Sequence, residues 1–259
     1  MSLRPFKNYD LPGMPPVLAW NPFAMRCTPV DEGCARCWAC GMAARLEKNP
    51  TIHPYNRESY AGGVPTRADS YMKCQRWPFP KNPHVIAIQF MGDLWHPSCD
   101  VLRPWVINDI ISDGRNDKHV FLLLTKRPER VTETLPDNCW LGTSVHDQTS
   151  ADSRIPQLLK VKCKHRWISA EPLLGNIEFC CNCNNRSFDL GYPRAIEFIA
   201  CGPETGAGSR PCDPLWIASI SEYCNLNLTA FYDKRDPSTQ GFTRREWPQE
   251  WIDKIGGKK

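Results

Sequence analysis

The feature that most constrains the fold of this chain is a series of short apolar runs that alternate with helical patterns. Val85-Ile86-Ala87-Ile88 is apolar at every position, as a parallel strand buried on both faces requires. Strands are expected at Val17–Trp20, Val85–Phe90, Val120–Thr125, Cys139–Ser144, Arg166–Ala170, Ile196–Cys201 and Leu228–Tyr232. Helices are expected at Trp38–Lys48, Pro104–Asp113, Ser150–Lys160 and Asp213–Asn225. The alternation predicts an α/β fold, a partial (β/α) barrel of about six to seven parallel strands.

Composition excludes two classes of protein. With 41% hydrophobic and 23% charged residues among 259, the chain is not expected to be disordered. No apolar segment resembles a signal peptide or spans a bilayer, so we expect a cytoplasmic protein without a membrane partner. We expect an irregular N-terminal lead-in over 1–16, the barrel over 17–235 with a Cys-rich insertion near 180–194, and a C-terminal extension over 236–259. The net charge of +4 is compatible with a polyanionic partner.

Polar side chains follow the expected strands where each one ends. In an α/β barrel these positions meet at one face, which carries the active site. The set comprises Asp93, Lys126, Arg127, Ser144, Asp147, Glu171, Glu204, Lys234 and Arg235. It indicates a polar pocket, the alternative being solvated loop charges.

The chain has 14 cysteines, which in a cytoplasmic protein point to metal or redox chemistry rather than disulfides. Cys27, Cys34 and Cys37 follow the first strand with the spacing C-x6-C-x2-C. Three thiolates can hold a [4Fe–4S] cluster and leave one iron open to S-adenosylmethionine. The alternative is a structural zinc site that includes Cys40, but a position in the first strand–helix loop favours the cluster.

A second cysteine group lies in the expected insertion. Cys180, Cys181 and Cys183 could hold an auxiliary zinc ion or cluster, or serve in packing.

Several blocks of sequence resemble one family. They are Trp20-Asn21-Pro22, the C-x6-C-x2-C spacing with Gly33 before its second cysteine, Met91–His96, Leu123–Arg130, Trp140–Val145, Ser169–Gly175 and Gly202–Pro211. Through about residue 235 the chain resembles a phage-associated, radical-SAM-like family long without known function. The usual radical-SAM spacing is C-x3-C-x2-C with an aromatic residue before the third cysteine. Here the first gap is longer, Arg36 takes the aromatic position and Trp38 follows the cysteine.

The resemblance implies a reaction, because some members are glycinylthymidine radical SAM isomerases of thymidine hypermodification. They convert Nα-glycinylthymidine to Cα-glycinylthymidine in phage DNA: the 5′-deoxyadenosyl radical takes hydrogen from the glycine α-carbon, and the thymine methylene migrates to that carbon. The implied partners are DNA carrying modified thymidine and an electron donor such as flavodoxin or ferredoxin, in the host cytoplasm if the chain is viral. The alternatives are another radical SAM reaction (lyase or methylation), on nucleic acid or a small molecule, or a non-catalytic, zinc-stabilised nucleic-acid-binding module.

The resemblance also implies roles for single residues. Asp93 would accept the methionine ammonium of S-adenosylmethionine, while Ser144, Glu171 and Trp38 would complete the cofactor site. The cations available to hold the glycine carboxylate are Lys126, Arg127 and Arg210, and Glu204 belongs to the same catalytic pocket. Trp95, Trp140, Arg244 and Arg245 are candidates for DNA contacts, the alternative being core packing for the tryptophans and solvated surface for the arginines.

Overall fold

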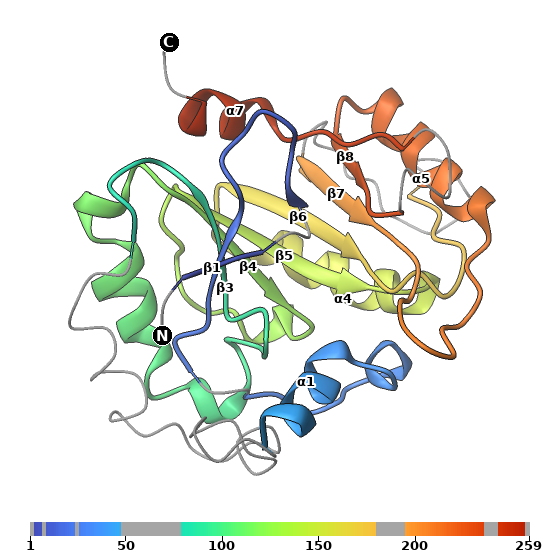
Figure 1. Cartoon of the computed structure of the whole chain (residues 1–259), viewed down its shortest axis with the longest axis horizontal. Coiled ribbons are helices and arrows are strands. Elements are labelled where there is room, and N and C mark those ends of the chain that lie inside the picture. The colour runs from blue at the N-terminus through green and yellow to red at the C-terminus, as the bar shows by residue number, and fades with distance from the viewer. Residues whose placement is uncertain are drawn as a thin grey trace.

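The computed structural model describes residues 3–6, 9–23, 26–47, 79–179, 195–235 and 243–256. These residues form one eight-stranded sheet in chain order, curled into a half-barrel (Figure 1). Its strands are β1 (Arg4–Pro5), β2 (Leu18–Trp20), β3 (Val85–Ile88), β4 (Val120–Thr125), β5 (Cys139–Val145), β6 (His165–Ala170), β7 (Phe198–Cys201) and β8 (Ala230–Asp233). Strand β1 is antiparallel to β2, and β2 to β8 are parallel. The predicted partial barrel of about six to seven parallel strands is therefore confirmed.

The strands are apolar at successive positions because both faces of the sheet are covered. In β4, Val120 and Leu122 belong to the apolar cluster inside the half-barrel. Their neighbours Phe121 and Leu123 belong to the cluster on the outside. All four side chains are buried, as the all-apolar pattern predicts.

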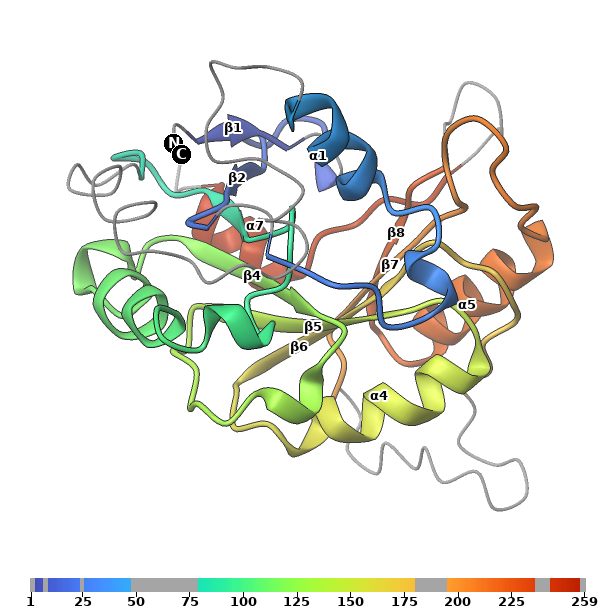
Figure 2. The same ribbon diagram turned by 90° about the horizontal axis from the view of Figure 1, so that it is seen from below.

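Helices cover the outer face of the sheet. They are the π-helix η4 (Trp105–Ile111), α4 (Gln148–Lys160) and α5 (Pro214–Leu226), which flank the curled sheet in Figure 2. Each contributes buried apolar side chains to the outer cluster, among them Ile107, Ile155 and Ile220. A capping box between Asp147 and Ser150 starts α4 two residues before its predicted beginning.

The inner face is filled from both ends of the chain. Tyr9 packs edge-on against Trp167, and Trp251 of α7 (Gln249–Ile255) packs against Trp140. The segments 1–16 and 236–259, expected outside the barrel, thus supply β1, Tyr9 and α7 to it. The half-barrel is a packed core, as the interiors of small α/β barrels are.

The remaining helices are single short turns, apart from the ten-residue α1. They are η2 (Glu32–Cys34), α1 (Trp38–Glu47), η3 (Pro97–Cys99), η5 (Gly114–Asn116) and η6 (Pro128–Arg130). No helix within the described ranges has the length and apolar character needed to cross a membrane.

The third strand ends earlier than its apolar pattern predicts. The prediction of Val85–Phe90 is wrong at its carboxyl end, because Gln89 takes a positive φ of 58° and turns the chain at Ile88. The Gln89 side-chain oxygen accepts a hydrogen bond from the Phe23 amide at 3.1 Å. This turn brings the segment after β3 against the segment after β2, where the candidate cysteines begin.

Candidate functional site

The cysteine loop (residues 26–37) connects β2 to α1 and is fastened to the segment that follows β3. The Asp93 amide donates to the Arg26 carbonyl at 3.0 Å. Gly92 permits this approach, because a Cβ there would lie 2.8 Å from the same carbonyl oxygen. The loop therefore lies at the carboxyl edge of the sheet, where the sequence predicts a polar pocket.

Asp93 lies at the predicted strand end and is buried. Its carboxylate accepts hydrogen bonds from the Trp95 amide at 2.9 Å, from Thr125 Oγ1 at 2.8 Å and from Arg127 Nη1 at 2.9 Å. The Lys126 amide adds another at 3.2 Å. Asp93 therefore joins the end of β3 to the end of β4, and an ammonium ligand would have to compete with these donors.

Arg127 carries this connection on to the first cysteine of the loop. Its Nη2 donates to the Thr28 carbonyl at 2.9 Å and to Thr28 Oγ1 at 3.1 Å. Burial raises the pKa of the neighbouring Cys27 thiol to about 12, and the Asp93 carboxylate raises it further while Arg127 opposes the change. A metal bound here would have to displace the thiol proton.

Lys126 reaches the second cysteine. Its ammonium lies 3.3 Å from Cys34 Sγ and 3.0 Å from Asp31 Oδ1. Asp31 also pairs with Arg154 of α4 and lies 3.8 Å from His146 Nδ1. Burial opposes ionisation of Asp31, but the contacts with Arg154 and Lys126 outweigh it and hold the pKa well below the usual range.

Glu204 and Arg210 join the loop after β7 to the same edge. Arg210 Nη2 lies 2.5 Å from the buried Glu204 carboxylate, and this hydrogen bonding lowers the pKa of Glu204. Arg210 Nη1 continues to Glu32 of the cysteine loop at 2.7 Å. The Glu32 side chain is 74% exposed, so this outer contact is much weaker than the inner one.

Glu171 faces a second polar cluster at the top of the inner face. Its carboxylate accepts from Tyr9 Oη at 3.3 Å and Ser169 Oγ at 3.2 Å, and pairs with Lys234. Lys234 Nζ also lies 5.0 Å from the centre of the Tyr9 ring. Burial and then the Glu171 charge raise the pKa of Tyr9 well above its usual value.

The other predicted contacts fall in different surroundings. Ser144 is buried, and its carbonyl accepts from Arg154 Nη1 at 2.7 Å. Trp38 begins α1 beside Cys37 and is 51% exposed. Cys180, Cys181 and Cys183 lie outside the described residues.

The four residues considered for DNA contacts are engaged within the protein. Trp95 and Trp140 are fully buried, which confirms core packing and makes the DNA-stacking role wrong. Arg244 pairs with Glu246 at 2.5 Å, and Arg245 donates to the Asp233 carbonyl at 3.1 Å.

Sequence reasoning omits several residues of this edge. His146 directly follows β5 and Asp31 lies between the first two cysteines, so their positions in the sequence could have marked both as site residues. No such position marks Arg154, which lies in the middle of α4, or Tyr9, which lies in the N-terminal segment. Their roles depend on how helix and N-terminus dock on the sheet.

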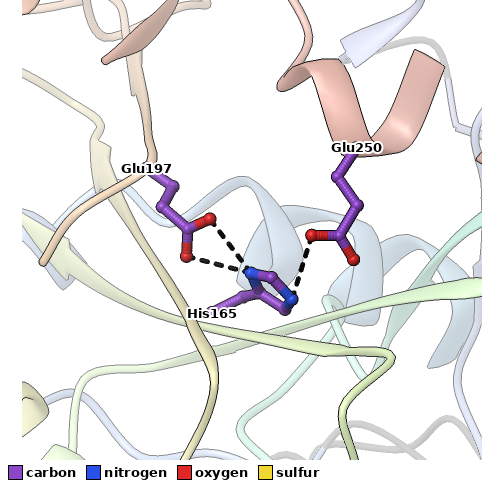
Figure 3. A group of neighbouring side chains, drawn as sticks. All are labelled: His165, Glu197 and Glu250. Atoms are coloured by element: carbon purple, nitrogen blue, oxygen red, sulfur yellow. Dashed lines mark hydrogen bonds and ion pairs between the residues drawn. The ribbon is translucent and has the colours of Figure 1, made fainter. Parts of the chain in front are cut away.

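A separate polar group lies at the opposite edge, where β6 and β7 begin. His165 Nδ1 is 3.0 Å from Glu197, and its Nε2 is 3.1 Å from Glu250 of α7 (Figure 3). The two carboxylates face opposite ring nitrogens, whose lone pairs diverge. The group is therefore arranged as an imidazole between two carboxylates rather than as three ligands around one ion.

Comparison with known proteins finds a match to a family model. Residues 17–250 match a family model described as a protein of unknown function (DUF5131). No curated protein and no solved structure matches the chain. Because the match covers almost all of the sequence, the chain belongs to the DUF5131 family of proteins of unknown function.

Proposed function

We propose that this chain is a radical S-adenosylmethionine enzyme that binds a [4Fe–4S] cluster through Cys27, Cys34 and Cys37. The observation that carries the proposal is the position of the cysteine loop, which contacts residues following β3, β4 and β7. Catalytic loops of α/β barrels occupy this edge, whereas a zinc site that only stabilises the fold has no need of it.

The thiols of the loop suit a cluster better than a single ion. All three are half-buried and reduced, and Lys126 and Arg127 lie beside two of them. Tetrahedral zinc holds its sulfurs about 3.8 Å apart, as bonds of about 2.3 Å require. Among the described residues, the three loop thiols do not all lie within 4.8 Å of one another, so they are not arranged as a zinc tetrahedron.

When bound, the cluster would supply an electron to S-adenosylmethionine and so generate the radical that abstracts hydrogen. The chain's own residues would hold both groups and exclude water. Trp38, Ser144 and Glu171 remain the proposed cofactor contacts, together with Asp93. The proposed electron donor is a low-potential protein such as flavodoxin or ferredoxin.

We infer that the reaction is the isomerisation of Nα-glycinylthymidine to Cα-glycinylthymidine in DNA. Its support is the resemblance of the strand-end blocks, together with a cation able to hold the glycine carboxylate. Lys126 and Arg127 are tied to Asp31 and Asp93, which are mostly buried. Arg210 fits the role better, because a substrate carboxylate could replace the exposed Glu32 on it at little cost.

An anaerobic preparation tests the class of enzyme. We expect a brown protein whose visible absorbance bleaches with dithionite and which releases 5′-deoxyadenosine from S-adenosylmethionine. A colourless protein with stoichiometric zinc and no iron would overturn the proposal in favour of the nucleic-acid-binding alternative.

Cysteine variants test the ligand set. Cys27→Ala, Cys34→Ala and Cys37→Ala should each abolish the cluster absorbance, because each removes one of only three thiolates. Cys40→Ala is the matched control from the same segment and should retain iron. Loss of iron in the control, measured by iron and sulfide analysis, would contradict the choice of ligands.

The substrate is tested with DNA that carries Nα-glycinylthymidine. After incubation and digestion to nucleosides, chromatography with mass spectrometry should show an isomer of unchanged mass. A product of different mass would indicate a lyase or methyl-transfer reaction and reject the isomerase assignment.

A further inference from the structure

Arg127 lies beside the first cysteine of the loop, Cys27, and Lys126 is the cation that reaches the second cysteine, Cys34. Its Nζ lies 3.3 Å from Cys34 Sγ, within the range of an N–H···S hydrogen bond. The side chain is 18% exposed, so water competes weakly for this contact. Lys126 directly follows the carboxyl end of β4, a central strand of the sheet.

The ammonium is held in place from several sides. Asp31 accepts from Nζ at 3.0 Å and is itself paired with Arg154 of α4. Gly33 keeps the space open, since a Cβ there would lie 3.0 Å from Lys126 Nζ and 2.9 Å from His146 Nδ1. The position of the Lys126 ammonium is thus determined by the cysteine loop together with β4, α4 and the residue that follows β5.

A fixed positive charge next to a sulfur has a definite electrostatic effect. Hydrogen bonds to the sulfurs are among the factors that set the reduction potential of iron–sulfur clusters. A donor ammonium stabilises the reduced state more than the oxidised state, because the reduced cluster carries more negative charge. In a mostly buried site this effect is weakly screened.

We propose that Lys126 is a positioning residue that donates to the Cys34 thiolate and raises the reduction potential of the cluster, rather than a substrate contact. The proposal rests on the proposed function, since it requires a cluster at Cys34. It reassigns Lys126 from the substrate pocket to the electron-accepting group. This role agrees with the contacts of Lys126, because Asp31 and Arg154 fix its ammonium beside Cys34 instead of leaving it open to a substrate.

The test is a redox titration of the reconstituted protein, followed by electron paramagnetic resonance. Lys126→Met keeps the length of the side chain and removes the charge, so the midpoint potential should move to a more negative value with iron content retained. Lys160→Met removes the same charge from an exposed position at the end of α4 and should leave the potential unchanged. An unaltered potential in Lys126→Met overturns the proposal.

If Lys126→Met does not bind iron, a second variant tests the proposal. Lys126→Arg retains a cationic donor, and iron bound at the parental potential supports the proposal. Failure of this variant to bind iron, or a shift as large as that expected of Lys126→Met, overturns it. Absence of iron from the unsubstituted protein would instead reject the proposed function itself, so the two failures are distinguishable.

Discussion

Gly142 shows how a single missing side chain shapes the barrel interior. Its position in β5 faces the Trp167 indole of β6, and a Cβ would lie 2.4 Å from Trp167 Cε2. The indole cannot move easily, because its Nε1 donates to the carbonyls of Leu123 at 3.1 Å and Trp140 at 3.0 Å. The glycine is thus required by close packing and not by backbone conformation.

We expect Gly142→Ala to lower the free energy of unfolding by about 1–3 kcal/mol, the usual cost of overpacking a core. Urea unfolding followed by tryptophan fluorescence measures the loss. Gly41→Ala is the control, because no atom lies within 4 Å of its added Cβ. Alanine also favours the helix there, so stability should hold or rise. Equal midpoints for Gly142→Ala and the parent would contradict this account of the packing.

Glu133 gives stability a defined dependence on pH. Burial opposes its ionisation, but hydrogen bonds from Arg103 at 2.6 Å and from Trp95 Nε1 at 3.1 Å prevail and lower the pKa of Glu133. A lowered pKa in the folded state stabilises the protein above the unfolded carboxyl pKa of about 4.3. The contribution is lost as pH falls through the folded value.

Glu133→Gln should therefore reduce stability by about 1–2 kcal/mol near neutral pH. The difference from the parent should remain constant from pH 8 to 6 and shrink below about pH 4. Unfolding by urea at a series of pH values measures it, with the exposed Glu129→Gln as control. A difference that grows on acidification would refute the assigned sign.

At the scale of elements, α7 is attached to the sheet by both apolar and polar contacts. Trp251 packs on Trp140 at a ring distance of 5.1 Å, while Glu250 pairs with His165. The His165 ring in turn stacks on Trp140 at 4.5 Å. The contact between Glu250 and His165 therefore orients a helix that the tryptophans already hold in place.

Glu250→Gln should loosen α7 without unfolding the barrel. We expect faster amide hydrogen exchange in Gln249–Ile255 and a global loss below about 1 kcal/mol, because the carboxylate is partly exposed. Exchange mass spectrometry resolves the segment, and Glu222→Gln on the exposed side of α5 serves as control. Unchanged exchange in α7 would show that the tryptophans alone secure it.

Elements with strong local signals are the ones that could be predicted from sequence. Strand β4 matches Val120–Thr125 at both ends, and Asp213 caps α5 next to Pro214 as expected. Helix α7 is missing from the predictions, because seven residues give too short a periodic pattern. The carboxyl end of β3 could not be predicted either, since the positive φ of Gln89 depends on its contact with Phe23.

At the scale of the whole molecule, the half-barrel brings residues that are far apart in the sequence together at one edge of the sheet. The cysteine loop contacts Lys126 directly after β4 and Arg210 in the loop that follows β7, and α4 adds Arg154. A single loop thus touches residues more than one hundred positions away. If the proposed function holds, this edge combines the cluster, its electrostatic environment and Arg210 for the substrate.

The amino-acid sequence alone determined the fold class and the positions from which the site is built. Parallel strands buried on both faces are apolar, and active-site side chains follow the strands at their carboxyl ends, so both patterns can be recognised from local sequence. Only the tertiary structure decided the pairing: Lys126 with Cys34 and Asp31, Arg127 with Asp93, and Arg210 with Glu204. The physical reason is that the partner of each charged side chain depends on the curvature of the sheet and on where the helices pack. Both result from many weak contacts distributed over the whole chain.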